Sequence, residues 1–122
     1  MNYYDVTPAT CIANVLGTEY KIYLDVPEDA DSFLDTCNGY CDKTVKRIVV
    51  VAERAENELA DWGAFRRLCL RHELIHAFLY ESGHDANTQW DIPGDEHPEQ
   101  MVEWVAVQFP KMLKVFQQVG AL

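Results

Sequence analysis

Apolar residues recur at steps of three and four along residues 59–79, and this spacing predicts a long helix with one buried face. Gly83 stands where a left-handed residue would end that helix, and the helix is expected to begin between Arg54 and Leu59. The predicted buried face consists of Leu59, Trp62, Phe65, Leu68, His72, Ile75, His76 and Leu79. Two histidines therefore lie on a face that is otherwise apolar.

The first half of the chain carries patterns typical of strands. Residues 10–26 predict a hairpin, with a turn at Gly17 and an alternating second strand. The β-branched run Val45–Val51 predicts another strand, covered on both faces over its second half and packed beneath the long helix. The acid-rich residues 27–35 predict a short helix or loop, and Cys37–Asp42, which contains Asn-Gly, predicts a turn.

A second helix is predicted near the end of the sequence. It is expected to begin near Pro98, and Pro110 should kink it or split it in two. Residues 84–97 show neither the periodicity of a helix nor that of a strand, which predicts a loop. The sequence thus predicts an α+β fold in a single domain over residues 1–122, with a small sheet, formed by the hairpin and one further strand, packed on two helices. The expected buried positions of the second helix are Met101, Val102, Val105, Phe109, Met112, Leu113 and Phe116.

The pattern from His72 to His76 is typical of a metal site, because two histidines one helical turn apart can reach the same ion. Glu73 lies one step round the helix, where a carboxylate can touch a metal-bound water without being a ligand. This is the H-E-x-x-H pattern of zinc peptidases. The pattern predicts a Zn2+ site with Glu73 as general base, against the alternative that a short string has arisen by chance.

A catalytic zinc ion usually has three protein ligands and one open position, so a third ligand is needed. Glu99 lies 23 residues after His76, in the first turn of the second predicted helix, and Glu103 follows one turn later. One of these carboxylates can bind zinc while the other accepts the remaining ring N–H of a liganding histidine. We take Glu99 as the expected ligand, with Glu103 as the alternative ligand or the orienting residue.

Together, the segment His72–His76 and the helix from Glu99 to Ala106 resemble a minimal gluzincin. They are similar to the small zincin-like metallopeptidases of phage and bacterial genomes and to the ImmA/IrrE peptidases. The resemblance covers roughly the second half of the chain. It implies a minimal zincin-like fold, Glu99 as the zinc ligand and Glu103 as the residue that orients a liganding histidine. No segment resembles the DNA-binding or sensor domains of ImmA/IrrE proteins, so the resemblance does not extend to a regulatory role.

These features predict a zinc-dependent metallopeptidase that acts on a peptide or protein substrate. Glu73 would take the proton from the metal-activated water and pass it to the leaving amine. The candidates for the donor that stabilises the oxyanion are Tyr80, His84 and His97. The alternative is a catalytically inactive zincin-like module that binds zinc or a partner protein.

Cysteines offer a different zinc site. Cys37 and Cys41 could join His72 and His76 in a closed Cys2His2 site without catalysis. The separation of the two pairs far exceeds the spacing of a zinc finger, which argues against this arrangement. The four widely spaced cysteines are expected to be free thiols.

The net charge and the hydropathy of the sequence limit the classes of partner that can be expected. Twenty acidic residues against ten basic ones give a formal net charge of −10, which repels phosphate backbones and anionic membranes, so neither nucleic acid nor a membrane is an expected partner. No run of about 18 apolar residues occurs, and Met1–Asp5 does not resemble a signal peptide. A cytoplasmic protein is expected, and the sequence leaves its oligomeric state open.

Overall fold

The secondary structure consists of short strands followed by two long helices, which confirms the predicted α+β class. The computed structural model of the chain describes residues 2–83 and 99–122. In chain order the elements are α1 (Tyr3–Val6), β1 (Cys11–Val15), β2 (Thr18–Val26), the 3-10 helices η1 (Glu28–Ala30) and η2 (Ser32–Asp35), β3 (Gly39–Asp42), β4 (Arg47–Val51), α2 (Trp62–Glu81) and α3 (Glu99–Gln118).

The strands form one mixed sheet in the order β1-β2-β4-β3. The predicted hairpin is confirmed as the antiparallel pair β1 and β2, whereas β4 runs parallel to β2 and antiparallel to β3. β4 is the strand predicted over Val45–Val51, and its residues Ile48–Val51 are all buried. Because side chains alternate along a strand, such a run must be covered on both faces of the sheet.

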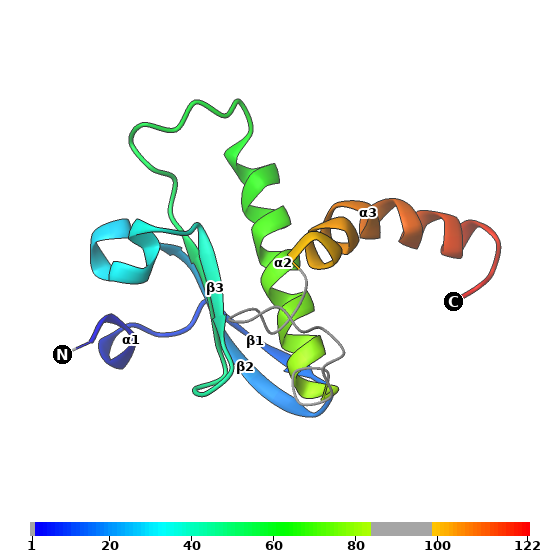
Figure 1. Ribbon diagram of the computed structural model, residues 1–122, viewed down its shortest axis with the longest axis horizontal. Helices are drawn as coiled ribbons and strands as arrows, with labels where there is room; N and C mark the ends of the chain where they lie inside the picture. The colour runs from blue at the N-terminus through cyan, green and yellow to red at the C-terminus, as the bar shows by residue number, and fades with distance from the viewer. Residues whose placement is uncertain (1, 84–98) are drawn as a thin grey trace.

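Each face of the sheet has its own apolar layer, with α2 on one side and α1 on the other (Figure 1). The layer under α2 consists of Val15, Tyr20, Ile22, Ile48 and Ala77. The opposite layer, which α1 and the 3-10 helices cover, consists of Tyr23, Val26, Leu34, Val49 and Val51. The sheet is therefore the middle layer, and apolar packing holds α2 in place independently of the site that it carries.

α2 begins later than predicted and ends where predicted. The side chain of Asp61 accepts a hydrogen bond at 3.0 Å from the backbone N–H three residues later and so forms the N-cap. The prediction of a start between Arg54 and Leu59 is wrong, because Asn57 turns the chain there by accepting a hydrogen bond from the Leu59 N–H at 2.9 Å. Gly83 follows the helix with φ +85°, as predicted for a left-handed residue.

α2 has two apolar faces rather than the single one predicted. The face toward the sheet carries Leu70, Leu74 and Ala77. A second face, toward α3, carries Ile75 and Leu79, which line a groove between the two helices. The prediction of one face is wrong because the helix has neighbours on two sides.

Strand β3 lies where the sequence predicts a turn, so the sheet has one strand more than predicted. Gly39 begins β3, and a β-carbon at this position would lie 2.7 Å from the Val49 carbonyl oxygen. Only glycine allows the two backbones to approach so closely. The turn comes after the strand instead: the Asp42 carboxylate accepts a hydrogen bond from the Thr44 N–H at 2.9 Å, and Lys46 has a left-handed φ of +56°.

α3 runs as one helix through Pro110, so of the two predicted outcomes, a kink or a split, the split does not occur. Its fully buried residues are Val102 and Ala106. Positions further along were predicted to be buried, but Phe109 is 44% and Phe116 is 40% exposed. The reason is that α2 is the main neighbour of α3, and the C-terminal half of α3 extends away from it (Figure 1).

Two predictions concern residues outside the described ranges, namely the loop over residues 84–97 and the helix start at Pro98. Within the described ranges, no helix combines the length and the apolarity that a membrane crossing requires.

Glu81 attaches the last turn of α2 to the sheet. Its carboxylate accepts hydrogen bonds from the Tyr20 and Thr18 hydroxyls, both at 2.7 Å, and from the Lys46 ammonium at 2.9 Å. The Glu81 side chain is only 13% exposed. The Tyr20 hydroxyl first, and then the Lys46 and Thr18 donors, favour the charged carboxylate and lower its pKa to about 2.

Glu81→Gln is expected to lower the free energy of unfolding by about 2 kcal/mol at neutral pH, because the three donors lose their charged acceptor. The folded pKa of Glu81 lies below its ordinary value of 4.5, so the wild-type advantage is complete above that pH and disappears as the pH falls toward about 2. Urea unfolding at neutral and acid pH measures both effects. Glu19→Gln, an exposed change on the same hairpin, is the control. Equal stability of Glu81→Gln and wild type at neutral pH would contradict the role given to Glu81.

Candidate metal centre

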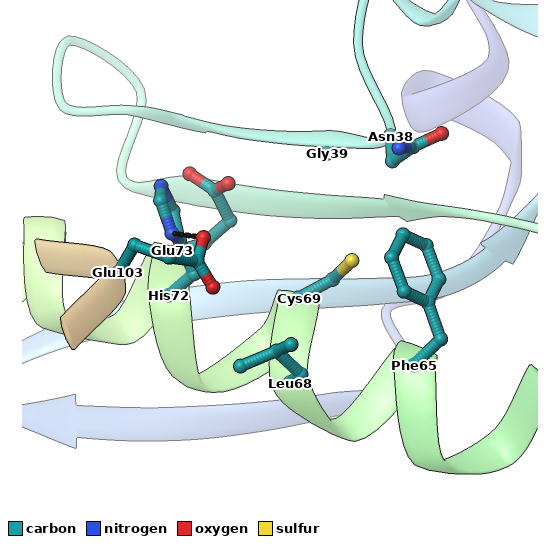
Figure 2. A pocket seen from close by; sticks show the side chains of 8 residues that line it. All are labelled: Asn38, Gly39, Phe65, Leu68, Cys69, His72, Glu73 and Glu103. Atoms are coloured by element: carbon teal, nitrogen blue, oxygen red, sulfur yellow. Dashed lines mark hydrogen bonds and ion pairs between the residues drawn. The ribbon is translucent and has the colours of Figure 1, made fainter. Parts of the chain in front are cut away.

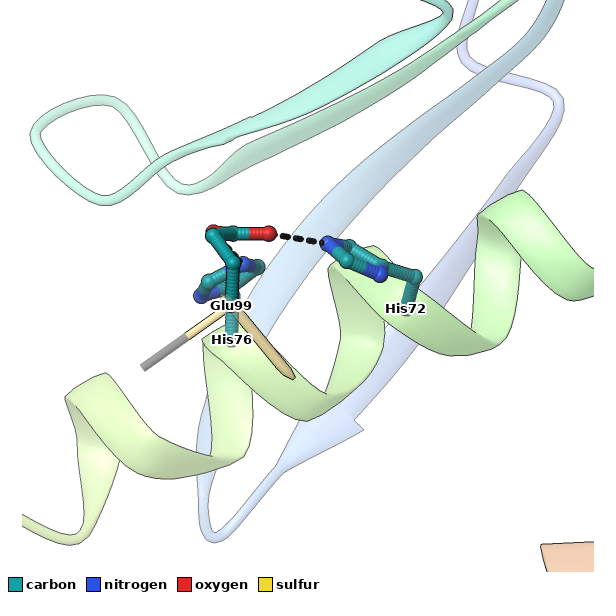
Figure 3. Close-up of side chains that lie close together, drawn as sticks. All are labelled: His72, His76 and Glu99. Atoms are coloured by element: carbon teal, nitrogen blue, oxygen red, sulfur yellow. Dashed lines mark hydrogen bonds and ion pairs between the residues drawn. The ribbon is translucent and has the colours of Figure 1, made fainter. Parts of the chain in front are cut away.

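The imidazoles of His72 and His76 lie one turn apart on α2, with ring centroids 5.1 Å apart. Both Nε2 atoms face the carboxylate of Glu99, which begins α3 (Figure 3). His72 Nε2 is 2.9 Å from Glu99 Oε2, and His76 Nε2 is 2.9 Å from Glu99 Oε1. The side chains of His72 and His76 are 15% and 10% exposed. The fold thus brings together, from two helices, the three residues predicted as ligands.

Glu103 contacts the other side of the same imidazole. His72 Nδ1 is 3.0 Å from Glu103 Oε2 (Figure 2), so His72 has a carboxylate at each ring nitrogen. Glu99 meets the Nε2 atoms of both histidines, whereas Glu103 meets only Nδ1 of His72. This geometry matches the preference stated from the sequence, with Glu99 as the candidate ligand and Glu103 as the residue that orients a ring.

The donor set fits a zinc ion. One ligand atom from each of His72, His76 and Glu99 lies within 4.8 Å of the others. Ligand atoms held at about 2.1 Å around a tetrahedral zinc ion are about 3.4 Å apart, so small side-chain adjustments suffice. Two imidazoles and one carboxylate are typical of open zinc sites, in which a fourth position remains for water or substrate. Among the described residues, no other group of three His, Cys, Asp or Glu side chains has this geometry.

Glu73 points from α2 toward β3 and is 8% exposed (Figure 2). Burial is the largest influence on its carboxyl group and raises the pKa to about 7, with His72 lowering it and Glu99 and Glu103 raising it. A carboxyl group with a pKa near neutrality can both accept and donate a proton at physiological pH. Glu73 therefore has the property that a general base and acid requires.

The site lies between two adjoining pockets, which α2 and β3 border. The larger, of about 400 Å³, extends toward Tyr80, and the smaller, of about 220 Å³, extends toward Phe65 (Figure 2). The residues that border both pockets are Gly39, His72 and Glu73. The two pockets together form a groove. His72 and the candidate base Glu73 lie where the pockets meet, and His76 and Glu99 border the larger pocket, with room for a substrate on either side of His72.

Of the three predicted oxyanion donors, Tyr80 lies in the described part of the chain and borders the larger pocket. Its ring centroid is 6.2 Å from that of His76. His84 and His97 lie outside the described residues.

Cys37 and Cys41 border the larger pocket but do not belong to the group with metal-ligand geometry, whose third member comes from α3. Burial raises the pKa of the Cys41 thiol to about 12, so this thiol is protonated at neutral pH in the metal-free chain. A thiol must lose its proton to bind zinc. The prediction that the four cysteines are free thiols is confirmed.

The feature of the site that the sequence does not reveal is β3 as the second wall of the groove. A strand of four residues, Gly39–Asp42, is too short to display a clear alternation of apolar and polar positions. The Asn-Gly pair before it is a strong turn signal and favours the wrong assignment. The strand exists because β4 offers a long buried edge to pair with, which is a tertiary effect.

Comparisons of the chain with protein-family models, with curated proteins and with solved structures found no match. The resemblance to gluzincins therefore depends on the residues of α2 and α3 alone.

Glu73→Gln is expected to stabilise the metal-free protein at alkaline pH by about 2 kcal/mol, because it removes a buried charge. The folded pKa of about 7 lies above the ordinary 4.5, so the native state holds a proton longer than the unfolded chain does. Wild-type stability should therefore fall as the pH rises from 4.5 to 7, and the variant should lack this loss. Urea unfolding in the presence of a chelator measures the effect, with the exposed change Glu58→Gln as control. A difference between Glu73→Gln and wild type that does not vary with pH would contradict the shifted pKa.

Proposed function

We propose that this chain is a zinc-dependent metallopeptidase that hydrolyses peptide bonds. The observation that carries the proposal is Glu99, which reaches from α3 to the Nε2 atoms of His72 and His76 at 2.9 Å each. Such a trio, beside a groove, is the protein part of an open zinc site. Glu103 at His72 Nδ1 and the buried Glu73 add the orienting residue and the base that peptide hydrolysis needs.

Each side chain has a separate task in this proposal. Bound between the histidines and Glu99, a zinc ion would polarise the substrate carbonyl and lower the pKa of a water molecule. Glu73, which is buried beside the histidines, would take the proton of that water and pass it to the leaving amine. By accepting the Nδ1–H of His72, Glu103 would leave the Nε2 lone pair available to a metal ion. Tyr80 is our candidate for the donor to the oxyanion, because it borders the same pocket.

The groove supports an extended peptide as substrate. β3 pairs with β4 and with no other described strand, so it has one open edge. The Asn38 carbonyl accepts a hydrogen bond from the Val51 N–H at 2.9 Å, and alternate residues of an antiparallel ladder face the partner strand. Cys41 therefore turns its backbone groups toward the open edge. An extended peptide that pairs there would place a carbonyl near Glu73.

We expect the variants of the site to differ in how strongly they retain zinc. Glu99→Gln should weaken binding most, because it replaces an anionic ligand with a neutral amide, and Glu103→Gln should weaken it about tenfold through the orientation of the imidazole. Glu73→Gln should retain zinc close to wild type. A chelator titration of the purified variants gives the order, with Cys37→Ser and Cys41→Ser as controls that keep the metal. Earlier zinc loss from Glu103→Gln than from Glu99→Gln would show that the two glutamates are assigned the wrong way round, and loss from either cysteine variant would favour the closed Cys2His2 site.

Glu73→Gln is expected to keep zinc and fold while losing hydrolysis by about 100-fold or more, since it removes the base and not a ligand. Cleavage of a broad peptide library, followed by mass spectrometry, measures activity, and metal analysis of the same samples measures zinc. Glu58→Gln is the control for loss of one exposed carboxylate. A wild-type protein with a full equivalent of zinc and no cleavage would instead support the inactive zincin-like module.

A further inference from the structure

α3 contains a proline in its interior and continues past it. Pro110 has no N–H, so the carbonyl of Ala106, four residues earlier, loses the hydrogen bond that it would receive within the helix. Ala106 is fully buried, and an unpaired carbonyl there would cost free energy. Arg71 of α2 provides the missing donor, because its Nε lies 2.8 Å from the Ala106 oxygen.

This hydrogen bond is adjacent to the metal centre on both helices. Arg71 precedes His72 on α2, and Ala106 lies about one turn after Glu103 on α3. Residues separated by four and then three positions, as Glu99, Glu103 and Ala106 are, share one face of a helix. The contacts of His72 with the two glutamates and of Arg71 with Ala106 therefore belong to the same α2–α3 interface.

Outside the metal centre, where His72 and His76 meet Glu99 and Glu103, the Arg71 hydrogen bond is a directional contact between α2 and α3. α2 is the main neighbour of α3 among the described elements, and the fully buried residues of α3 are Val102 and Ala106. Apolar packing has no preferred direction, whereas a hydrogen bond to one carbonyl requires a particular distance and angle. Pro110 makes the Ala106 carbonyl available to a donor from outside the helix, because the partner within the helix is missing.

We propose that Arg71 is a positioning residue for the metal centre. By donating to the carbonyl that Pro110 leaves open, Arg71 fixes the register of α3 on α2 and thereby the reach of Glu99 and Glu103 to the histidines. The proposal rests on the proposed function, since it takes His72, His76 and Glu99 as zinc ligands. It adds a residue that contacts neither the ion nor the substrate.

A double-mutant cycle between Arg71 and Pro110 tests the proposal. Arg71→Met keeps an apolar stem without a donor, and Pro110→Ala restores an N–H that can pair with Ala106 inside α3. Alone, Arg71→Met should weaken zinc binding about tenfold, the effect expected of one lost hydrogen bond from a charged donor. With Pro110→Ala present, the same change should weaken binding less than about twofold, because the carbonyl has a partner again. Competition with a chromophoric chelator gives the zinc affinity, and the Co2+ absorption spectrum reports the ligand geometry.

Control variants distinguish an effect on the position of α3 from an effect on the overall stability of the protein. Arg67→Met removes an exposed guanidinium one turn earlier in α2 and should leave zinc affinity unchanged. Arg71→Lys, whose ammonium can donate to the same carbonyl, should restore most of the affinity. Urea unfolding of the metal-free variants should show the same coupling between Arg71 and Pro110.

Two outcomes would overturn the inference while leaving the proposed function in place. One is an equal loss of zinc affinity on Arg71→Met in both backgrounds, and the other is no loss in either. A wild-type chain that binds no zinc would remove the proposed function itself and the positioning role with it. In that case any coupling seen in urea unfolding would describe helix packing alone.

Discussion

Packing of α2 against the parallel strands β2 and β4 is the constraint on which the rest of the structure depends. Ala77 lies against the sheet with its small side chain fully buried, and Leu70 and Leu74 pack beside it. His72, Glu73 and His76 take their positions from this helix. The opposite wall of the groove, β3, is held by pairing with β4, so both walls depend on the same central strands.

α2 carries two carboxyl groups whose pKa values are shifted in opposite directions. Burial raises the pKa of Glu73 to about 7, whereas three donors lower that of Glu81 to about 2. Glu81 strengthens the attachment of α2, and the charged form of Glu73 weakens it. A buried carboxyl group with a raised pKa, such as Glu73, is typical of sites that transfer protons. Such a site costs stability, which the remainder of the fold must offset.

The parts of the fold that could be predicted are those set by local patterns. Alternation around Tyr20 and Ile22 predicts β2, and the spacing of His72 and His76 predicts that both face one point from a helix. The start of α2 could not be placed, because capping by Asp61 and the turn at Asn57 decide it. The sequence favours Glu99 over Glu103 as the ligand but leaves Glu103 as an alternative, since only the packing of two helices decides which carboxylate meets Nε2. β3 could not be predicted either, because its pairing with β4 is a long-range effect.

The candidate ligands are divided between a helix packed on the sheet and a helix whose second half extends outward (Figure 1). An ion held by all three side chains would be a reversible cross-link between these two parts of the chain. Because a ligand stabilises the state that binds it, an ion at 100 times its dissociation constant would add about 2.7 kcal/mol to the docked arrangement of α3. The supply of metal would then govern two properties together, namely the readiness of the site for chemistry and the time for which α3 stays attached.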